Sequence, residues 1–112
     1  MSGLRFTAFL VACITFSACA HTASTQPASD LDRLARGFIA TLSQEDLAAF
    51  EKAGKSDLPM FHFGAGSRVR QLYFGPQGEG RKAFCTPDAY CDIDAESMRI
   101  VERAWQMIHG VG

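Results

Sequence analysis

The N-terminal segment decides how much of this chain is left to build a folded core. Arg5 is the only charged residue before Asp30, and residues 6–18 are all apolar, small or hydroxylated. An apolar stretch of roughly a dozen residues behind one positive charge is typical of a secretory signal peptide. It is shorter than the ~20 apolar residues that a membrane-spanning helix needs. We therefore expect residues 1–18 to be removed and residues 30–112 to fold.

The segment ends in Phe16-Ser17-Ala18-Cys19, which resembles the lipobox of bacterial lipoproteins. That motif usually reads Leu, then Ser or Ala, then Gly or Ala, then Cys, so Phe16 stands where Leu is preferred. The resemblance implies that Cys19 becomes the first mature residue and carries three acyl chains, which bind the bilayer with ~0.8 kcal/mol per buried CH2. An ordinary cleaved signal peptide and a buried core helix are the alternatives.

The residues after Cys19 indicate where the anchored protein faces. Ala20 stands at the place where, in enterobacteria-like sorting, an Asp retains a lipoprotein in the inner membrane. The resemblance therefore implies the outer membrane, with the protein facing the periplasm. Residues 19–29 are small and polar, contain Pro27 and have no hydrophobic period, which predicts a flexible tether.

Residues 30–112 are too few for two independent cores, so they predict one small domain. The chain has 11 Lys and Arg against 12 Asp and Glu, a net charge of −1. A nucleic-acid-binding protein normally has a clear basic excess, so this class is disfavoured. We expect no cofactor.

Two cysteines remain for the folded domain, because Cys13 leaves with the leader and Cys19 is acylated. In the oxidising periplasm we expect Cys85 and Cys91 to form a disulfide. Free thiols are one alternative, and a metal site that also uses His62 or His109 is the other. Five residues separate the two cysteines, which is not the tight pair of zinc ribbons, and we expect no metal.

Helical periodicity predicts a mainly α domain of about three to four helices with a Gly-rich, disulfide-containing loop segment. Three helices are predicted from the spacing of apolar residues, over 30–42, 43–54 and 94–110. Their expected N-caps are Ser29 or Asp30, Ser43 and Asp94.

The segment between these helices is harder to interpret. Residues 55–59 predict a turn, and the glycines of residues 60–66 predict a loop. Residues 67–74 have helical spacing, although Val69, Gln71 and Tyr73 also alternate as in a strand, and we prefer a helix. Gly75-Pro76-Gln77-Gly78-Glu79-Gly80 predicts a further loop.

Residues 61–71, FHFGAGSRVRQ, resemble the signature of a small uncharacterised bacterial domain family. Its pattern has a His, a Gly and an apolar-Arg-Asn step, then Asp-x-x-Ser and a helix with Trp. The later part corresponds here to Asp94-Ala95-Glu96-Ser97, Ile100, Val101 and Trp105, while Gln71 replaces the usual Asn. The similarity spans roughly residues 42–108 and implies a small, mainly helical fold and no chemistry.

Basic residues and one histidine are the candidates for a binding site. Arg68, Arg70, Arg81 and Lys82 lie near glycines and would suit an anion; the alternative is a solvated face, with Arg68 paired to the acidic segment that follows. His62 lies between two phenylalanines and is a candidate base or ligand. The alternative for His62 is a histidine held by a local hydrogen bond beside the core, because no nucleophile stands at recognisable spacing.

Acidic residues around the second cysteine are a weaker candidate site. Four carboxylates (Asp88, Asp92, Asp94 and Glu96) would suit calcium, but their spacing is not that of an EF-hand. We expect the Trp105 side chain to lie in the core. The alternative is an exposed tryptophan that stacks on the sugars of peptidoglycan.

These observations predict a membrane-anchored lipoprotein with a non-enzymatic binding domain and a periplasmic protein partner. Small lipoproteins that neutralise secreted toxic effectors share this size and anchoring, which is an analogy of architecture only. The alternative is an accessory structural lipoprotein that docks on an envelope complex through the face between Arg68 and Lys82. A small hydrolase that pairs His62 with an acid from residues 88–96 is a third hypothesis.

Overall fold

The computed structural model describes residues 29–111. The elements along this part of the chain are α2 (Asp30–Ala40), α3 (Gln44–Lys52), the 3-10 helix η1 (Lys55–Phe61), the π-helix η2 (His62–Gly66), α4 (Ser67–Tyr73), α5 (Glu79–Phe84) and α6 (Ile93–Ile108). The predicted mainly α fold is confirmed, and residues 29–111 contain no strand. The predicted signal peptide, Cys19 and residues 20–28 of the tether lie outside the described residues. In the described part, no helix is long and apolar enough to cross a bilayer.

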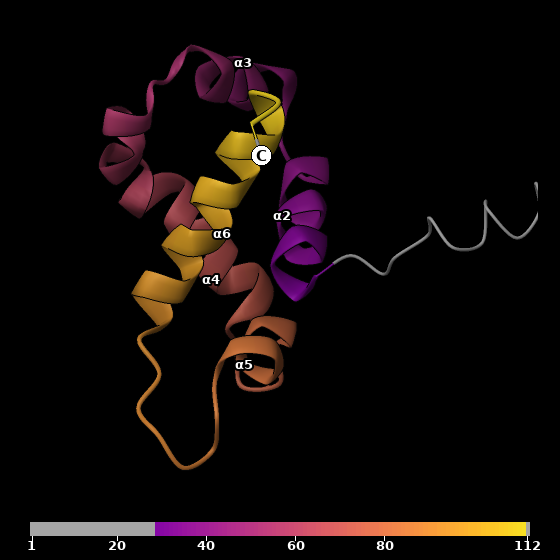
Figure 1. Ribbon diagram of the computed structural model, residues 1–112, viewed down its shortest axis with the longest axis vertical. Coiled ribbons are helices and arrows are strands. Elements are labelled where there is room, and N and C mark those ends of the chain that lie inside the picture. Colours follow the sequence, from indigo (N-terminus) through magenta and orange to yellow (C-terminus); the bar gives the residue numbers. More distant parts are fainter. Residues whose placement is uncertain (1–28, 112) are drawn as a thin grey trace, which may run out of the picture.

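Helix α6 lies at the centre of the domain, with α2 along one side and α4 and η2 against another (Figure 1). Its amphipathic pattern directs one stripe of side chains into a core shared by the surrounding helices. The buried apolar residues are Leu34, Ala35, Phe38, Phe50, Leu58, Val69, Phe74, Ile100, Val101 and Ala104. Ser97 is also buried, and its hydroxyl donates to the Ile93 carbonyl at 2.7 Å, so the polar group is satisfied inside the helix.

Side-chain caps begin the three longest helices. The Ser29 hydroxyl accepts from the Asp32 amide at 3.2 Å, and the Ser43 hydroxyl accepts from the Asp46 amide at 3.0 Å. Both agree with the sequence. The N-cap of α6 is Asp92 and not Asp94, because the Asp92 carboxylate accepts from the third helical amide at 3.0 Å. The prediction of Asp94 was wrong by two residues.

Residues 55–66 are helical, so the predictions of a turn over 55–59 and a loop over 60–66 were wrong. Side-chain packing holds this segment in η1 and η2: Leu58 is buried, and the Phe61 ring stacks on Phe50 with centroids 4.7 Å apart. The Asp57 carboxylate accepts from the Gly54 amide at 2.9 Å and caps the start. Tertiary contacts here outweigh the low helix propensity of the glycines.

Helix α5 begins at Glu79, inside the segment predicted as a loop. The glycine at position 80 lets this helix lie directly on the Phe74 ring. A Cβ at this position would be only 2.7 Å from a ring atom, too close for a real contact. The close approach lets Phe74 stay buried beneath the short helix. The Arg81 Nε donates to the carbonyls of Phe74 at 3.0 Å and Gly75 at 3.1 Å, which ties α5 to the end of α4.

The C-terminal half of α6 is fastened to α3 and α2 by polar contacts. The Trp105 Nε1 donates to the Ala53 carbonyl at 2.8 Å, and the His109 Nε2 lies 2.9 Å from the Phe50 carbonyl. The Arg103 Nε lies 2.7 Å from the Asp32 Oδ1 on α2. Trp105 therefore packs against the core. This agrees with the predicted core position and not with the alternative of an exposed stacking platform.

Candidate functional site

A disulfide between Cys85 and Cys91 closes the loop between α5 and α6, as the sequence predicted. The two Cα atoms are 5.4 Å apart. The loop projects beyond the helices at one end of the domain (Figure 1). The helices α5 and α6 hold the two ends of the loop, and the disulfide joins these ends. The loop therefore presents its side chains in a restricted set of conformations.

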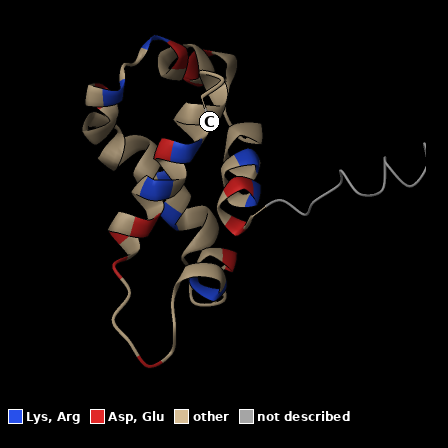
Figure 2. Cartoon of the chain, viewed as in Figure 1, with Lys and Arg blue, Asp and Glu red and all other residues tan. Residues whose placement is uncertain are grey.

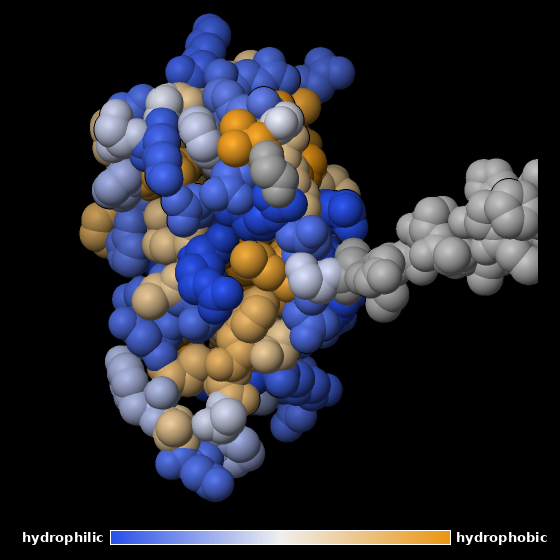
Figure 3. Space-filling model, in the orientation of Figure 1, coloured by the Kyte–Doolittle hydropathy of each residue, from blue (hydrophilic) through white to orange (hydrophobic). Residues whose placement is uncertain are grey.

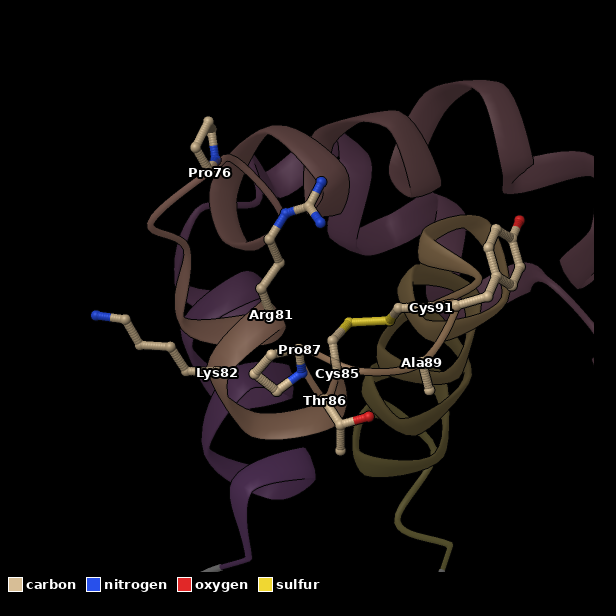
Figure 4. Close-up of a pocket in the computed structure, with 9 residues that line it drawn as sticks. Pro76, Arg81, Lys82, Cys85, Thr86, Pro87, Ala89 and Cys91 are labelled. Atoms are coloured by element: carbon tan, nitrogen blue, oxygen red, sulfur yellow. A yellow bond between two sulfur atoms is a disulfide. The ribbon is translucent and has the colours of Figure 1, made fainter.

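Tyr90 is the most exposed large side chain on this loop, with 91% of its surface accessible. It borders a shallow open pocket of about 690 Å³ beside the disulfide (Figure 4). We call the lining residues the loop face: Pro76, Arg81, Lys82, Cys85, Thr86, Pro87, Ala89, Tyr90 and Cys91. On the side of the domain seen in Figure 3, hydrophobic side chains form a central band between hydrophilic ones.

Of the predicted basic residues, only Arg81 and Lys82 belong to the loop face. Arg81 is held by the two carbonyl contacts of its Nε, whereas Lys82 points outward (Figure 4). Lys82 is exposed, and within the described part of the chain it takes part in no ion pair within 4.0 Å.

Arg68 and Arg70 lie on α4 and are paired elsewhere. The Arg68 Nη1 is 3.3 Å from the Asp46 Oδ2. The Arg70 Nη1 is buried and lies 3.3 Å from the Asp94 Oδ1, an ion pair without hydrogen-bond geometry. The four cations that the sequence grouped are therefore divided between the loop face and α4. Figure 2 likewise shows acidic and basic residues interspersed along α2 and α6.

His62 lies in a different groove, of about 560 Å³, which Lys55 and Glu102 also line. Its ring meets the Phe63 ring edge-on, with centroids 5.0 Å apart. The Lys55 Nζ is 3.9 Å from the Glu102 Oε1. No acid from residues 88–96 is among the residues that line this groove.

Three of the four acidic residues near Cys91 have partners within the structure. Asp92 caps α6, Asp94 pairs with Arg70, and Glu96 pairs with Arg99 at 2.7 Å. Within residues 29–111 no group of three His, Cys, Asp or Glu side chains could hold a metal ion.

Two groups that pack α2 against its neighbours, the Tyr73 hydroxyl and the Asp32 carboxyl, have shifted pKa values. Burial raises the pKa of the Tyr73 hydroxyl, which donates to the Leu34 carbonyl at 2.9 Å. The hydrogen bond from Arg103 lowers the pKa of Asp32. Both groups support the fold and lie outside the loop face.

Sequence reasoning missed the exposed aromatic and apolar residues. Tyr90 stands between the two cysteines that were expected to bond, and this position in a closed loop was the available signal. Met60 and Phe63 are 82% and 85% exposed, and no periodicity separates them from the inward-facing Phe61. Comparisons with protein-family models, curated proteins and solved structures find no match.

Proposed function

We propose that this protein is a membrane-anchored lipoprotein facing the periplasm, and that its domain binds a protein partner in the envelope without catalysing a reaction. The observation that carries the binding role is Tyr90, 91% exposed on the disulfide-closed loop. Lys82, on the same face, supplies a charge at the rim.

The loop face has the properties of a compact protein-recognition surface. Tyrosine is enriched among the residues that dominate binding energy, because it buries a large ring and offers a hydroxyl at little entropic cost. The disulfide between Cys85 and Cys91 reduces the ordering cost of the loop on binding. Pro76 and Pro87 flank the pocket and restrict its backbone further.

The anchor is supported by the sequence before residue 29. Residues 16–19 resemble a lipobox, Cys19 supplies the thiol, and Ala20 favours the outer membrane. Export to the periplasm also agrees with the disulfide, because such bonds persist in oxidising compartments.

The proposal is tested by crosslinking in living cells. The full chain carries a photo-crosslinking amino acid at position 90, and a matched protein carries it at position 51, which is also exposed but lies on α3. The expected result is a defined protein adduct from position 90 that position 51 does not give. Equal adducts from both positions, or none from position 90, would contradict the proposal.

The identity of the captured protein separates the two forms of this role. A foreign secreted effector would assign the protein to neutralisation. An abundant envelope component in fixed stoichiometry would assign it to the accessory structural role.

A further inference from the structure

Four exposed residues around the junction of η1 and η2, none of them charged, form what we call the apolar edge: Pro59, Met60, Phe63 and Gly64. Its two large side chains, Met60 and Phe63, are 82% and 85% exposed. Between Asp57 and Arg68 the chain has no formal charge, with His62 counted as neutral.

The neighbours of the apolar edge pack inward, and this leaves the edge residues facing solvent. Leu58 and Phe61, the neighbours of the edge residues along the chain, are anchored in the core and against Phe50. Met60 lies in η1 and Phe63 in η2, on either side of the junction between them. A Cβ added at Gly64 would have no atom within 4 Å. The surface beyond the edge is therefore open.

We infer that the apolar edge contacts the surface of the phospholipid leaflet to which the protein is anchored. This inference depends on the lipid anchor of the proposed function. Two exposed apolar side chains such as Met60 and Phe63 are suited to the boundary between headgroups and acyl chains. They bind lipid weakly by themselves, but a tether raises the local concentration of the leaflet and makes such weak contacts effective.

The length of the chain before residue 29 permits this contact. Ten peptide units separate Cys19 from Ser29, where α2 is about to begin, and they reach at most about 35 Å. Helix α2 has 11 residues and is about 16 Å long. The tether can therefore run along the side of the domain while the apolar edge rests on the leaflet.

The same orientation leaves the loop face accessible. In Figure 1, η1 and η2 lie far from the Cys85–Cys91 loop, which is at the other end of the domain. When the apolar edge faces lipid, the loop that carries Tyr90 lies at the end of the domain away from the leaflet. The lipid contact would thus present the binding loop to proteins in the periplasm.

The test uses the full lipidated chain in vesicles of phosphatidylethanolamine and phosphatidylglycerol. A photo-crosslinking amino acid is placed at position 63, and the matched control carries it at position 90, which is as exposed and also aromatic. We expect phospholipid adducts from position 63 in several-fold higher yield than from position 90. Equal yields, or none from position 63, would overturn the inference. A protein adduct in place of lipid from position 63 in cells would overturn it as well.

Mass spectrometry of residue 19 in the same samples separates this inference from its premise. An acylated Cys19 without lipid adducts at position 63 would reject the apolar edge and leave the anchor standing. An unmodified Cys19 would reject the anchor, and the inference with it.

Discussion

The hydroxyl of Tyr73 occupies the space that a side chain at Gly37 would need. A Cβ at Gly37 would lie 2.4 Å from the Tyr73 hydroxyl oxygen, which donates to the Leu34 carbonyl at 2.9 Å. A glycine in the middle of α2 is thus explained by the close packing of α4 on it, although glycine costs a helix about 1 kcal/mol relative to alanine.

Gly37→Ala should destabilise the domain by about 1 kcal/mol, because overpacking and a displaced hydroxyl outweigh the better helix propensity. In a Tyr73→Phe background the same change should stabilise, since the nearest ring carbon is then 3.7 Å from the added Cβ. Urea unfolding of the four proteins measures the coupling. Gly64→Ala is the control, with open space around the new methyl group. Equal effects of Gly37→Ala in both backgrounds would refute the contact.

The ion pair of Asp32 with Arg103 should make stability depend on pH in the acid range. The hydrogen bond from Arg103 holds the pKa of Asp32 below its ordinary value of 3.8. A carboxyl whose pKa is lower in the folded state stabilises the protein above the unfolded pKa and loses that contribution as the pH falls through the folded pKa. Asp32→Asn should therefore lower the unfolding midpoint at pH 7, with a difference that fades below about pH 3.8.

Asp30→Asn is the matched control for this titration. Asp30 is also in the first turn of α2, but its partner Arg33 is half exposed, at 51% of the side chain. Exposed pairs contribute little, so its midpoint should change less than that of Asp32→Asn. A constant difference between Asp32→Asn and the parent from pH 7 to pH 2 would show that charge plays no part.

The disulfide should contribute about 2 kcal/mol to stability, because it closes a short loop and the unfolded chain loses correspondingly little entropy. Replacing Cys85 and Cys91 together by Ala should lower the free energy of unfolding by that amount. Reduction of the parent protein should give the same loss, and reductant should leave the double variant unchanged. Unfolding curves that do not respond to reductant in the parent would contradict the bond.

Tyr90→Ala should weaken binding of the captured partner without affecting the fold. A residue that dominates an interface contributes about 2 kcal/mol or more, which corresponds to roughly thirty-fold in Kd. Lys82→Ala, at the rim, should weaken binding less and mainly slow association. Surface plasmon resonance checks both effects, and the unfolding midpoint of each variant should match the parent. Unchanged affinity for Tyr90→Ala would remove the loop face from the binding site.

The sequence predicts the long elements of this fold because their signals are local. Apolar periodicity and the Ser29 and Ser43 caps locate α2 and α3, and the stripe before Gly110 locates α6. By contrast, η1, η2 and α5 depend on packing contacts that residue spacing does not reveal: the Phe61 ring stacks on Phe50, and the α5 backbone approaches the Phe74 ring. Such packing overrides local glycine signals and cannot be inferred from spacing.

Part of the candidate site could be predicted from the sequence, namely the disulfide, but the placement of the basic and exposed apolar residues could not. The pairing of Cys85 with Cys91 was predicted by counting cysteines and by the expected export to an oxidising compartment. The grouping of Arg68 with Lys82 does not follow from proximity in sequence, because α4 directs its arginines toward Asp46 and Asp94. Met60 and Phe63 are exposed because their neighbours Leu58 and Phe61 pack inward instead. Which of these apolar residues is buried depends on the three-dimensional packing and not on their spacing in the sequence.

We propose that one acylated cysteine holds this small domain at a membrane. The most direct measurement is mass spectrometry of the mature protein purified from membranes. We predict an N-terminal Cys19 that carries diacylglycerol and an N-linked acyl chain, and a Cys19→Ala variant that no longer fractionates with membranes. A protein that retains Met1, or one whose Cys19 is unmodified, would contradict the account.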